Sequence, residues 1–75
     1  MPKIPSLKPR QVINVLLKKG FIERNTSGSH HIFKHSDSGK IVSIPVHGGH
    51  DIKKGTLRNI IRQSGMSVEE FLESL

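Results

Sequence analysis

The tripeptide Gly28-Ser29-His30 is the segment of this chain best suited to catalysis. Histidine serves in proton transfer because its ordinary pKa, about 6.5, lies near neutral pH. His30 follows two small residues and begins an apolar stretch, in a basic chain without cysteine. An imidazole beside positive charge suits chemistry on phosphates. The alternative interpretation is a strand histidine that only bonds a backbone carbonyl.

The charge of the chain favours a polyanionic partner. Twelve Lys and Arg against six Asp and Glu give the 75 residues a formal net charge of +6. Neutralising phosphates releases counterions and steers association, which fits a nucleic acid. An acidic protein partner would satisfy the same charge. Three Phe and neither Tyr nor Trp make a platform for base stacking improbable.

The length and composition bound the class of protein. A chain of 75 residues has room for one domain with a thin core, so residues 1–75 are predicted to form a single domain. Without cysteine there is neither a disulfide nor a thiolate metal site. No apolar run approaches the ~20 residues that span a bilayer, and no signal-peptide pattern precedes the basic residues. We therefore expect a cytoplasmic protein that does not contact a membrane.

A first helix is predicted near the N-terminus. Pro9 suits the first turn of a helix, and Gly20 can take the left-handed conformation that closes one. Between them apolar residues recur at the i, i+3, i+4 spacing of an amphipathic helix. The stripe expected to be buried consists of Val12, Ile13, Leu16 and Leu17.

Two further helices are predicted in the C-terminal part. The first begins at about Lys53 and ends at Gly65, with a buried stripe of Leu57, Ile60 and Ile61. Ser67 and Glu70 match a capping box, which predicts a short helix through residues 71–72.

Three strands are predicted between the first two helices, at residues 21–25, 30–35 and 40–47. Residues 26–28 and 36–39 have the composition of turns. Pro45 cannot donate to a strand ladder, so the third strand should lie at an edge. The order α-β-β-β-α predicts an α+β fold, with a three-stranded antiparallel sheet and the helices on one face.

Strand alternation then assigns the histidines to faces. If Asp37 pairs with Lys40 in the second hairpin, His30 lies across from His47. The core face would hold Phe33, Val42, Ile44 and Val46, with His31 and His35 on the same side. The open face would present His30, Lys34 and His47.

The remaining candidate residues are basic. Lys54, Arg58 and Arg62 align along one edge of the second predicted helix, and Lys53 stands at its start. We predict that they contact RNA phosphates, the alternative being a solvated helix face. The segment from His47 to Asp51 lacks a recognised metal-ligand spacing, so we predict neither a metal nor another cofactor.

The order and spacing of several segments resemble the HicA (YcfA-like) toxins of bacterial and archaeal toxin–antitoxin systems. The resemblance covers nearly the whole chain. It is carried by Lys19-Gly20-Phe21, Gly28-Ser29-His30 with Phe33, Ile44-Pro45-Val46-His47, Lys54-Gly55-Thr56-Leu57-Arg58 with Ile60, and Arg62-Gln63-Ser64-Gly65.

This resemblance implies a fold like that of a double-stranded-RNA-binding domain. It also implies an mRNA interferase, an endoribonuclease that halts growth by cleaving transcripts. The histidine after Gly-Ser, here His30, is then the catalytic residue. A HicB-type antitoxin is the implied partner and inhibitor, whereas the oligomeric state of that complex stays open.

The expected reaction is metal-independent cleavage by the RNA's own 2′-OH. His30 would accept the proton of that hydroxyl or protonate the leaving 5′-oxygen. Lys34, His47 and Ser29 are the candidates for assistance, and water is the alternative for the second proton transfer. Two rival functions remain at this point, a non-catalytic RNA-binding module of the same fold and a metal-dependent nuclease.

Overall fold

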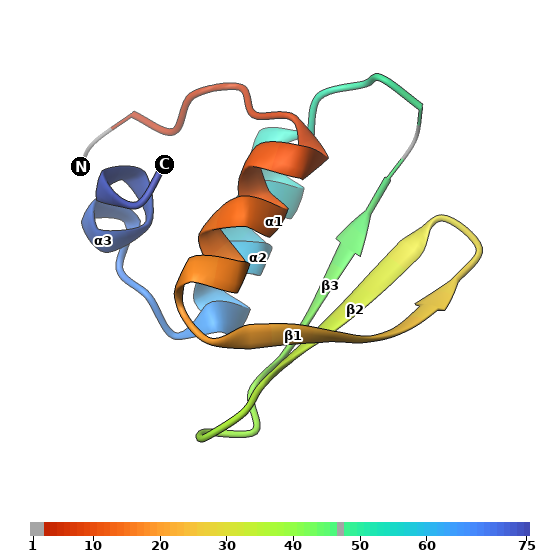
Figure 1. Cartoon of the computed structure of the whole chain (residues 1–75). Coiled ribbons are helices and arrows are strands. Elements are labelled where there is room, and N and C mark those ends of the chain that lie inside the picture. The colour runs from red at the N-terminus through yellow and green to blue at the C-terminus, as the bar shows by residue number, and fades with distance from the viewer. Residues whose placement is uncertain (1–2, 47) are drawn as a thin grey trace.

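A computed structural model describes residues 3–46 and 48–75, with the side chain of Ser27 outside that description. Its elements follow the predicted order α-β-β-β-α with a terminal helical turn (Figure 1). They are α1 (Pro9–Lys18), β1 (Phe21–Ser27), β2 (His30–His35), β3 (Ile41–Pro45), α2 (Lys54–Ser64) and α3 (Val68–Glu73). The prediction of an α+β fold is therefore confirmed.

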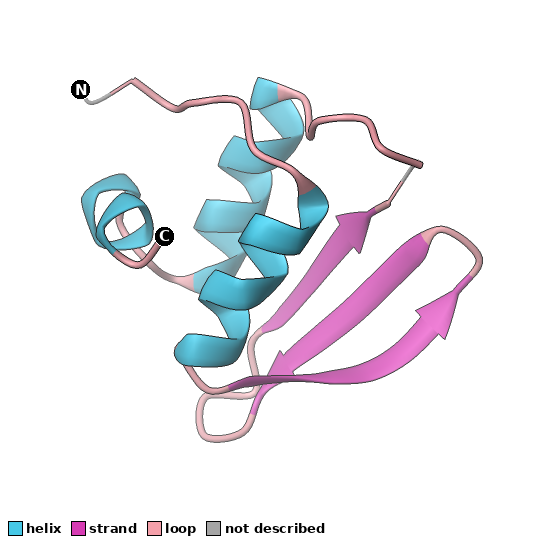
Figure 2. Cartoon of the chain, turned by 45° about the horizontal axis from the view of Figure 1, so that its top comes forward, coloured by secondary structure: helices cyan, strands magenta, loops and turns pink. Residues whose placement is uncertain are grey.

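The three strands form one antiparallel sheet in the order β1-β2-β3. Helices α1 and α2 lie side by side on one face of this sheet, and α3 lies beside the N-terminal segment (Figure 2). The opposite face, called the open face below, is not covered by any described helix. Within the described ranges, no helix has the length and apolar character needed to cross a membrane.

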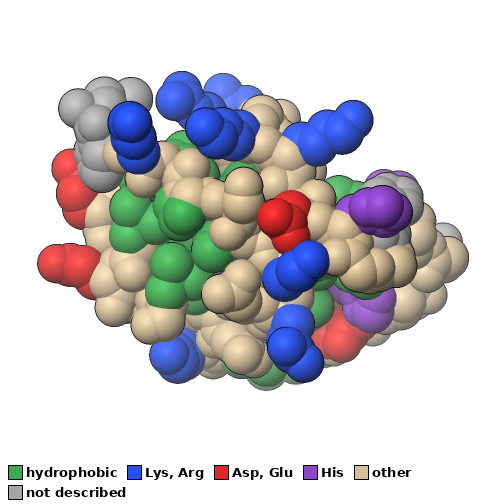
Figure 3. Space-filling model, turned by 90° about the horizontal axis from the view of Figure 1, so that it is seen from above, with side chains coloured by type: hydrophobic (Ala, Val, Ile, Leu, Met, Phe, Trp, Pro, Cys, Tyr) green, Lys and Arg blue, Asp and Glu red, His purple; other side chains and the backbone are tan. Residues whose placement is uncertain are grey.

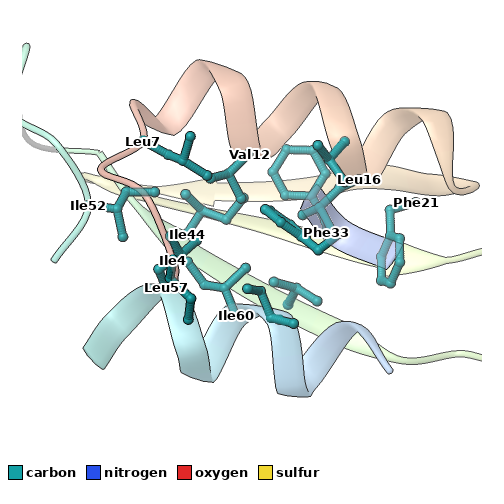
Figure 4. Close-up of a cluster of buried hydrophobic side chains, with 14 residues drawn as sticks. Ile4, Leu7, Val12, Leu16, Phe21, Phe33, Ile44, Ile52, Leu57 and Ile60 are labelled. Carbon is teal, nitrogen blue, oxygen red and sulfur yellow. The ribbon is translucent and has the colours of Figure 1, made fainter. Parts of the chain in front are cut away.

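The core fills the space between the two long helices and the sheet (Figure 4). It contains Ile4, Leu7, Val12, Val15, Leu16, Phe21, Phe33, Val42, Ile44, Ile52, Leu57, Ile60, Ile61 and Phe71. The stripe predicted for α2 is confirmed. In α1, however, Val15 is buried and Leu17 is 51% exposed. Leu17 lies too far around the helix from Val12 and Leu16 to share their face.

The first hairpin turns directly before the candidate histidine. Strand β1 continues to Ser27, which pairs with His30, so Gly28 and Ser29 alone form the turn. Gly28 has a φ of +60°, while Ser29 keeps a negative φ. A glycine at the first central position is what a type II′ hairpin turn requires. The pairing also shifts by one residue at Arg24, which is a β-bulge.

The second hairpin corrects the predicted register. The loop is the four-residue segment 36–39, closed by a 2.9 Å hydrogen bond from the His35 N–H to the Lys40 carbonyl. His30 consequently pairs with Pro45 and not with His47. Strand β3 ends at Pro45, and His47 lies outside the described residues. The pairing therefore differs from the predicted one by two positions.

This error leaves the predicted faces unchanged, because a shift of two residues keeps the side chains on the same side. Phe33, Val42 and Ile44 are fully buried as predicted, and Val46 packs against the core from a half-buried position. Pro45 is on the edge strand, which is also confirmed. The neighbouring Ser43 donates its N–H to the Gln63 side chain of α2 at 3.5 Å.

Candidate active site

His30 is the first residue of β2 and is exposed on the open face. It lies between Ser27 of β1 and Pro45 of β3. The Val46 N–H donates to the Ser29 carbonyl, so Ser29 and Val46 are a hydrogen-bonded pair. Because hydrogen-bonded and non-hydrogen-bonded pairs alternate along an antiparallel ladder, the next pair, His30 and Pro45, is a non-hydrogen-bonded one. Side chains approach most closely in such pairs, with Cβ atoms about 4.5–5.5 Å apart.

The histidine that bonds a backbone carbonyl is His35, not His30. Its Nε2 donates to the Lys19 carbonyl at 2.9 Å, and its Nδ1 accepts the N–H groups of Asp37 and Ser38 at 3.1 Å each. The ring also packs edge-on against Phe21, with the centroids 5.0 Å apart. These contacts tie the end of α1 to the second hairpin.

A second histidine belongs to a polar cluster on the opposite side of β2 from His30. His31 Nδ1 lies 2.7 Å from the carboxylate of Glu23, and the hydroxyl of Thr26 donates to the same oxygen. The Thr26 hydroxyl and then His31 lower the pKa of Glu23. Among the described residues, none forms a hydrogen bond with the ring of His30, so its imidazole is available to a ligand.

The Glu23 cluster predicts how stability depends on pH. Because folding lowers the Glu23 pKa, its contribution to stability is present above the ordinary pKa of about 4.5 and is lost as the pH falls through the lowered value. We expect Thr26→Val to raise the Glu23 pKa, measured by carboxyl NMR.

Glu23→Gln should reduce the difference in unfolding free energy between pH 7 and pH 3. An unchanged difference would contradict this role of Glu23.

Two of the residues predicted to assist His30, Ser29 and Lys34, lie at different distances from it along the chain. Ser29 precedes it in the turn, and the Ser29 carbonyl accepts the Val46 N–H at 2.7 Å. Lys34 is exposed on the predicted face, four residues along β2. At a strand rise of about 3.3 Å per residue, its Cα is about 13 Å from that of His30. Lys34 is therefore well separated from His30 along the same face of β2.

The predicted basic line on α2 is present but does not converge on His30. Arg58 and Arg62 line a hollow together with Ile4 of the N-terminal segment. The flank of α2 that faces β3 carries Thr56 and Gln63 instead. On the face drawn in Figure 3, the visible histidine side chains lie at one end of the molecule, while Lys and Arg side chains are spread over several parts of this face.

Of the four basic residues predicted for α2, Lys53 is the one that lines a cavity together with Pro45, the cross-strand neighbour of His30. It is the N-cap residue of α2 and is exposed, as is Lys54, the first residue of the helix. Lys53 lines a cavity that also includes Pro45. Lys53 therefore brings a positive charge to the end of the sheet that carries His30.

A loop contact that sequence reasoning missed fixes the segment between β3 and α2. Lys8 Nζ lies 2.9 Å from the Asp51 carboxylate and donates to the Gly49 carbonyl at 2.6 Å. The Ile52 N–H donates to the Leu7 carbonyl at 2.8 Å. No local pattern signals these contacts, because their partners are more than forty residues apart in the sequence. They hold the loop that carries His50.

Metal ligands do not cluster in the part of the chain that the structure describes. Within residues 3–46 and 48–75, no three His, Asp or Glu side chains come close enough to hold a metal ion.

Comparison with known families gives one match. The family model described as the HicA toxin of bacterial toxin–antitoxin systems matches residues 9–66. This range starts with α1, contains the whole sheet with His30, and extends past the end of α2. No curated protein matches the chain.

Proposed function

This chain belongs to the HicA toxin family of bacterial toxin–antitoxin systems, and we propose that it is an endoribonuclease whose catalytic residue is His30. The observation that carries this proposal is the position of His30. Its ring is exposed on the open face beside a tight turn, whereas the rings of His31 and His35 are engaged in structural hydrogen bonds. We further propose that residues 1–75 act as a single toxin domain.

The proposed step is an attack by the RNA on its own backbone. His30 accepts the proton of a 2′-OH as that oxygen bonds to the adjacent phosphorus. The bond from phosphorus to the 5′-oxygen breaks, and this oxygen takes up a proton. The products are a 2′,3′-cyclic phosphate and a 5′-hydroxyl. Water or His47 supplies the proton taken up by the 5′-oxygen. In the alternative assignment, His30 is the acid that protonates the 5′-oxygen, and water or His47 accepts the proton of the 2′-OH.

The positive charge of the chain supports binding of the substrate. The net charge of +6 favours a polyanion, and cations near the phosphate stabilise the charge that builds up during attack. Lys53 lines a cavity with Pro45, Lys54 follows it as the first residue of α2, and Lys34 lies farther along the open face. Arg58 and Arg62 are proposed to contact more distant phosphates.

The family also supports a protein partner. A toxin of a toxin–antitoxin system is paired with an antitoxin, and we propose one of the HicB type as the inhibitor of this chain. The basic surface would serve both the RNA and this inhibitor. We also propose that the protein acts in the cytoplasm, where its proposed substrates, transcripts, are present.

The test is an incubation of one mixed-sequence RNA and a DNA of the same sequence with the purified chain, with and without EDTA. We expect the RNA to be cut equally in both conditions and the DNA to stay intact. RNA that is bound but never cut would indicate a binding module instead. Cleavage that EDTA abolishes would indicate a metal-dependent nuclease, because chelation leaves the side chains of the protein unchanged.

A further inference from the structure

We propose that the cavity at the end of β3 is a subsite for the nucleotide next to the one that is cut. This inference rests on the proposed function, because it takes the RNA at His30 as its starting point. The cavity has a volume of about 510 Å³, within the range of pockets that hold small ligands. Its lining consists of Pro45, His50, Asp51, Ile52, Lys53 and Thr56.

The position of the cavity relates it to His30. Pro45 lines the cavity and is also the cross-strand neighbour of His30 on the open face. We infer that an RNA strand with its phosphate at His30 crosses Pro45 and places its next nucleotide at the cavity. The hollow beside Arg58 and Arg62 lacks this relation, because it is on the flank of α2 that faces Ile4 and α3.

The lining has the groups that a nucleotide needs. Ile52 is buried and gives the cavity an apolar floor for a base. The half-buried Thr56 offers a hydroxyl that both donates and accepts hydrogen bonds. Lys53 provides a positive charge for a phosphate, and the exposed His50 provides a ring on which a base can stack.

The acidic residue in the cavity lining, Asp51, forms an ion pair with a lysine. Asp51 would repel an RNA phosphate, but Lys8 lies 2.9 Å from its carboxylate. Lys8 also bonds the Gly49 carbonyl, so the loop and the carboxylate are held together. The second carboxylate oxygen of Asp51 remains an acceptor for an amino group of a base or for a 2′-OH. This arrangement favours a ligand with hydrogen-bond donors and a negative backbone, as RNA has.

The test uses an RNA hexamer of mixed sequence that carries 2′-O-methyl groups throughout and therefore cannot be cut by its own hydroxyls. Isotope-labelled wild-type chain is titrated with this probe and followed by amide NMR. We expect the largest shifts at residues 50–56 and around His30. Lys53→Met should weaken binding by about tenfold, corresponding to loss of one charge-assisted contact.

The matched control is Lys18→Met, which removes the same charge from the far end of α1. Among the described residues, the Lys18 side chain bonds the Ser74 carbonyl alone, at 3.1 Å. We expect it to weaken binding less than about twofold, the effect of net charge alone. Equal weakening by both variants, with amide shifts outside residues 50–56, would overturn the subsite.

A second measurement separates the subsite from the proposed function. The cut positions of wild type and Thr56→Val are mapped on a random RNA pool, and we expect the variant to change the base preference next to the cut. Shifts at residues 50–56 without any cleavage would disprove the nuclease function and leave the binding site standing. Cleavage with identical positions in both proteins and no shift at residues 50–56 would disprove the subsite alone.

Discussion

His30→Ala is expected to lower kcat/KM for RNA cleavage by about 10²- to 10⁴-fold, the usual contribution of a general acid or base. The fold should persist, because His30 is exposed and its ring bonds no other described residue. The rate is measured with a fluorescent RNA carrying a quencher, and the fold is followed by thermal unfolding. Binding of the uncleavable RNA by the variant should stay close to that of wild type.

The matched control for this prediction is His31→Ala. His31 is adjacent in sequence but points to the other side of β2, where it contacts Glu23. We expect its cleavage rate to stay within about threefold of wild type, because no proton transfer depends on it. Wild-type activity in His30→Ala, or an equal loss in both variants, would remove His30 from the catalytic role.

Phe33→Ala should have the largest effect on stability. Phe33 is fully buried in the central strand, and removal of a core phenylalanine costs about 3–5 kcal/mol. Domains gain only about 0.05–0.15 kcal/mol per residue on folding, so a chain of this length has little stability beyond that loss. We expect the variant to be largely unfolded at 37 °C, as measured by circular dichroism and chemical denaturation.

The control for this variant is Ile22→Ala on the open face. The Ile22 side chain is 54% exposed, so its truncation should cost less than about 1 kcal/mol. Similar losses for both variants would contradict the assignment of Phe33 to the core face.

The sequence was sufficient for the elements and for the two faces of the sheet. Gly20 takes a positive φ after the end of α1, as predicted, and Gly65 ends α2 as predicted, also with a positive φ. Ser67 caps α3 by accepting the Glu70 N–H at 3.0 Å, although the Glu70 carboxylate lies 3.3 Å from Lys19 instead of completing the capping box. Alternation of apolar residues was enough to place Phe33 in the core and His30 on the open face.

The register and the long-range contacts could not be predicted from local patterns. The segment from Ser36 to Gly39 suits either a two-residue or a four-residue loop, and both keep the same side chains in the core. The structure has the four-residue loop, closed by the hydrogen bond from the His35 N–H to the Lys40 carbonyl. With the four-residue loop, the cross-strand partner of His30 is Pro45 and not the predicted His47. The contact of Lys8 with Asp51 joins segments that are far apart in the sequence. No local sequence pattern therefore predicts it.

The identity of the new RNA ends tests most directly whether His30 activates the RNA's own 2′-OH. Mass spectrometry of the fragments produced by the wild-type chain should find 2′,3′-cyclic phosphates and 5′-hydroxyls, since the attacking oxygen belongs to the RNA. Fragments with 3′-hydroxyls and 5′-phosphates would mean that water attacked the phosphorus, and the proposed reaction would be wrong.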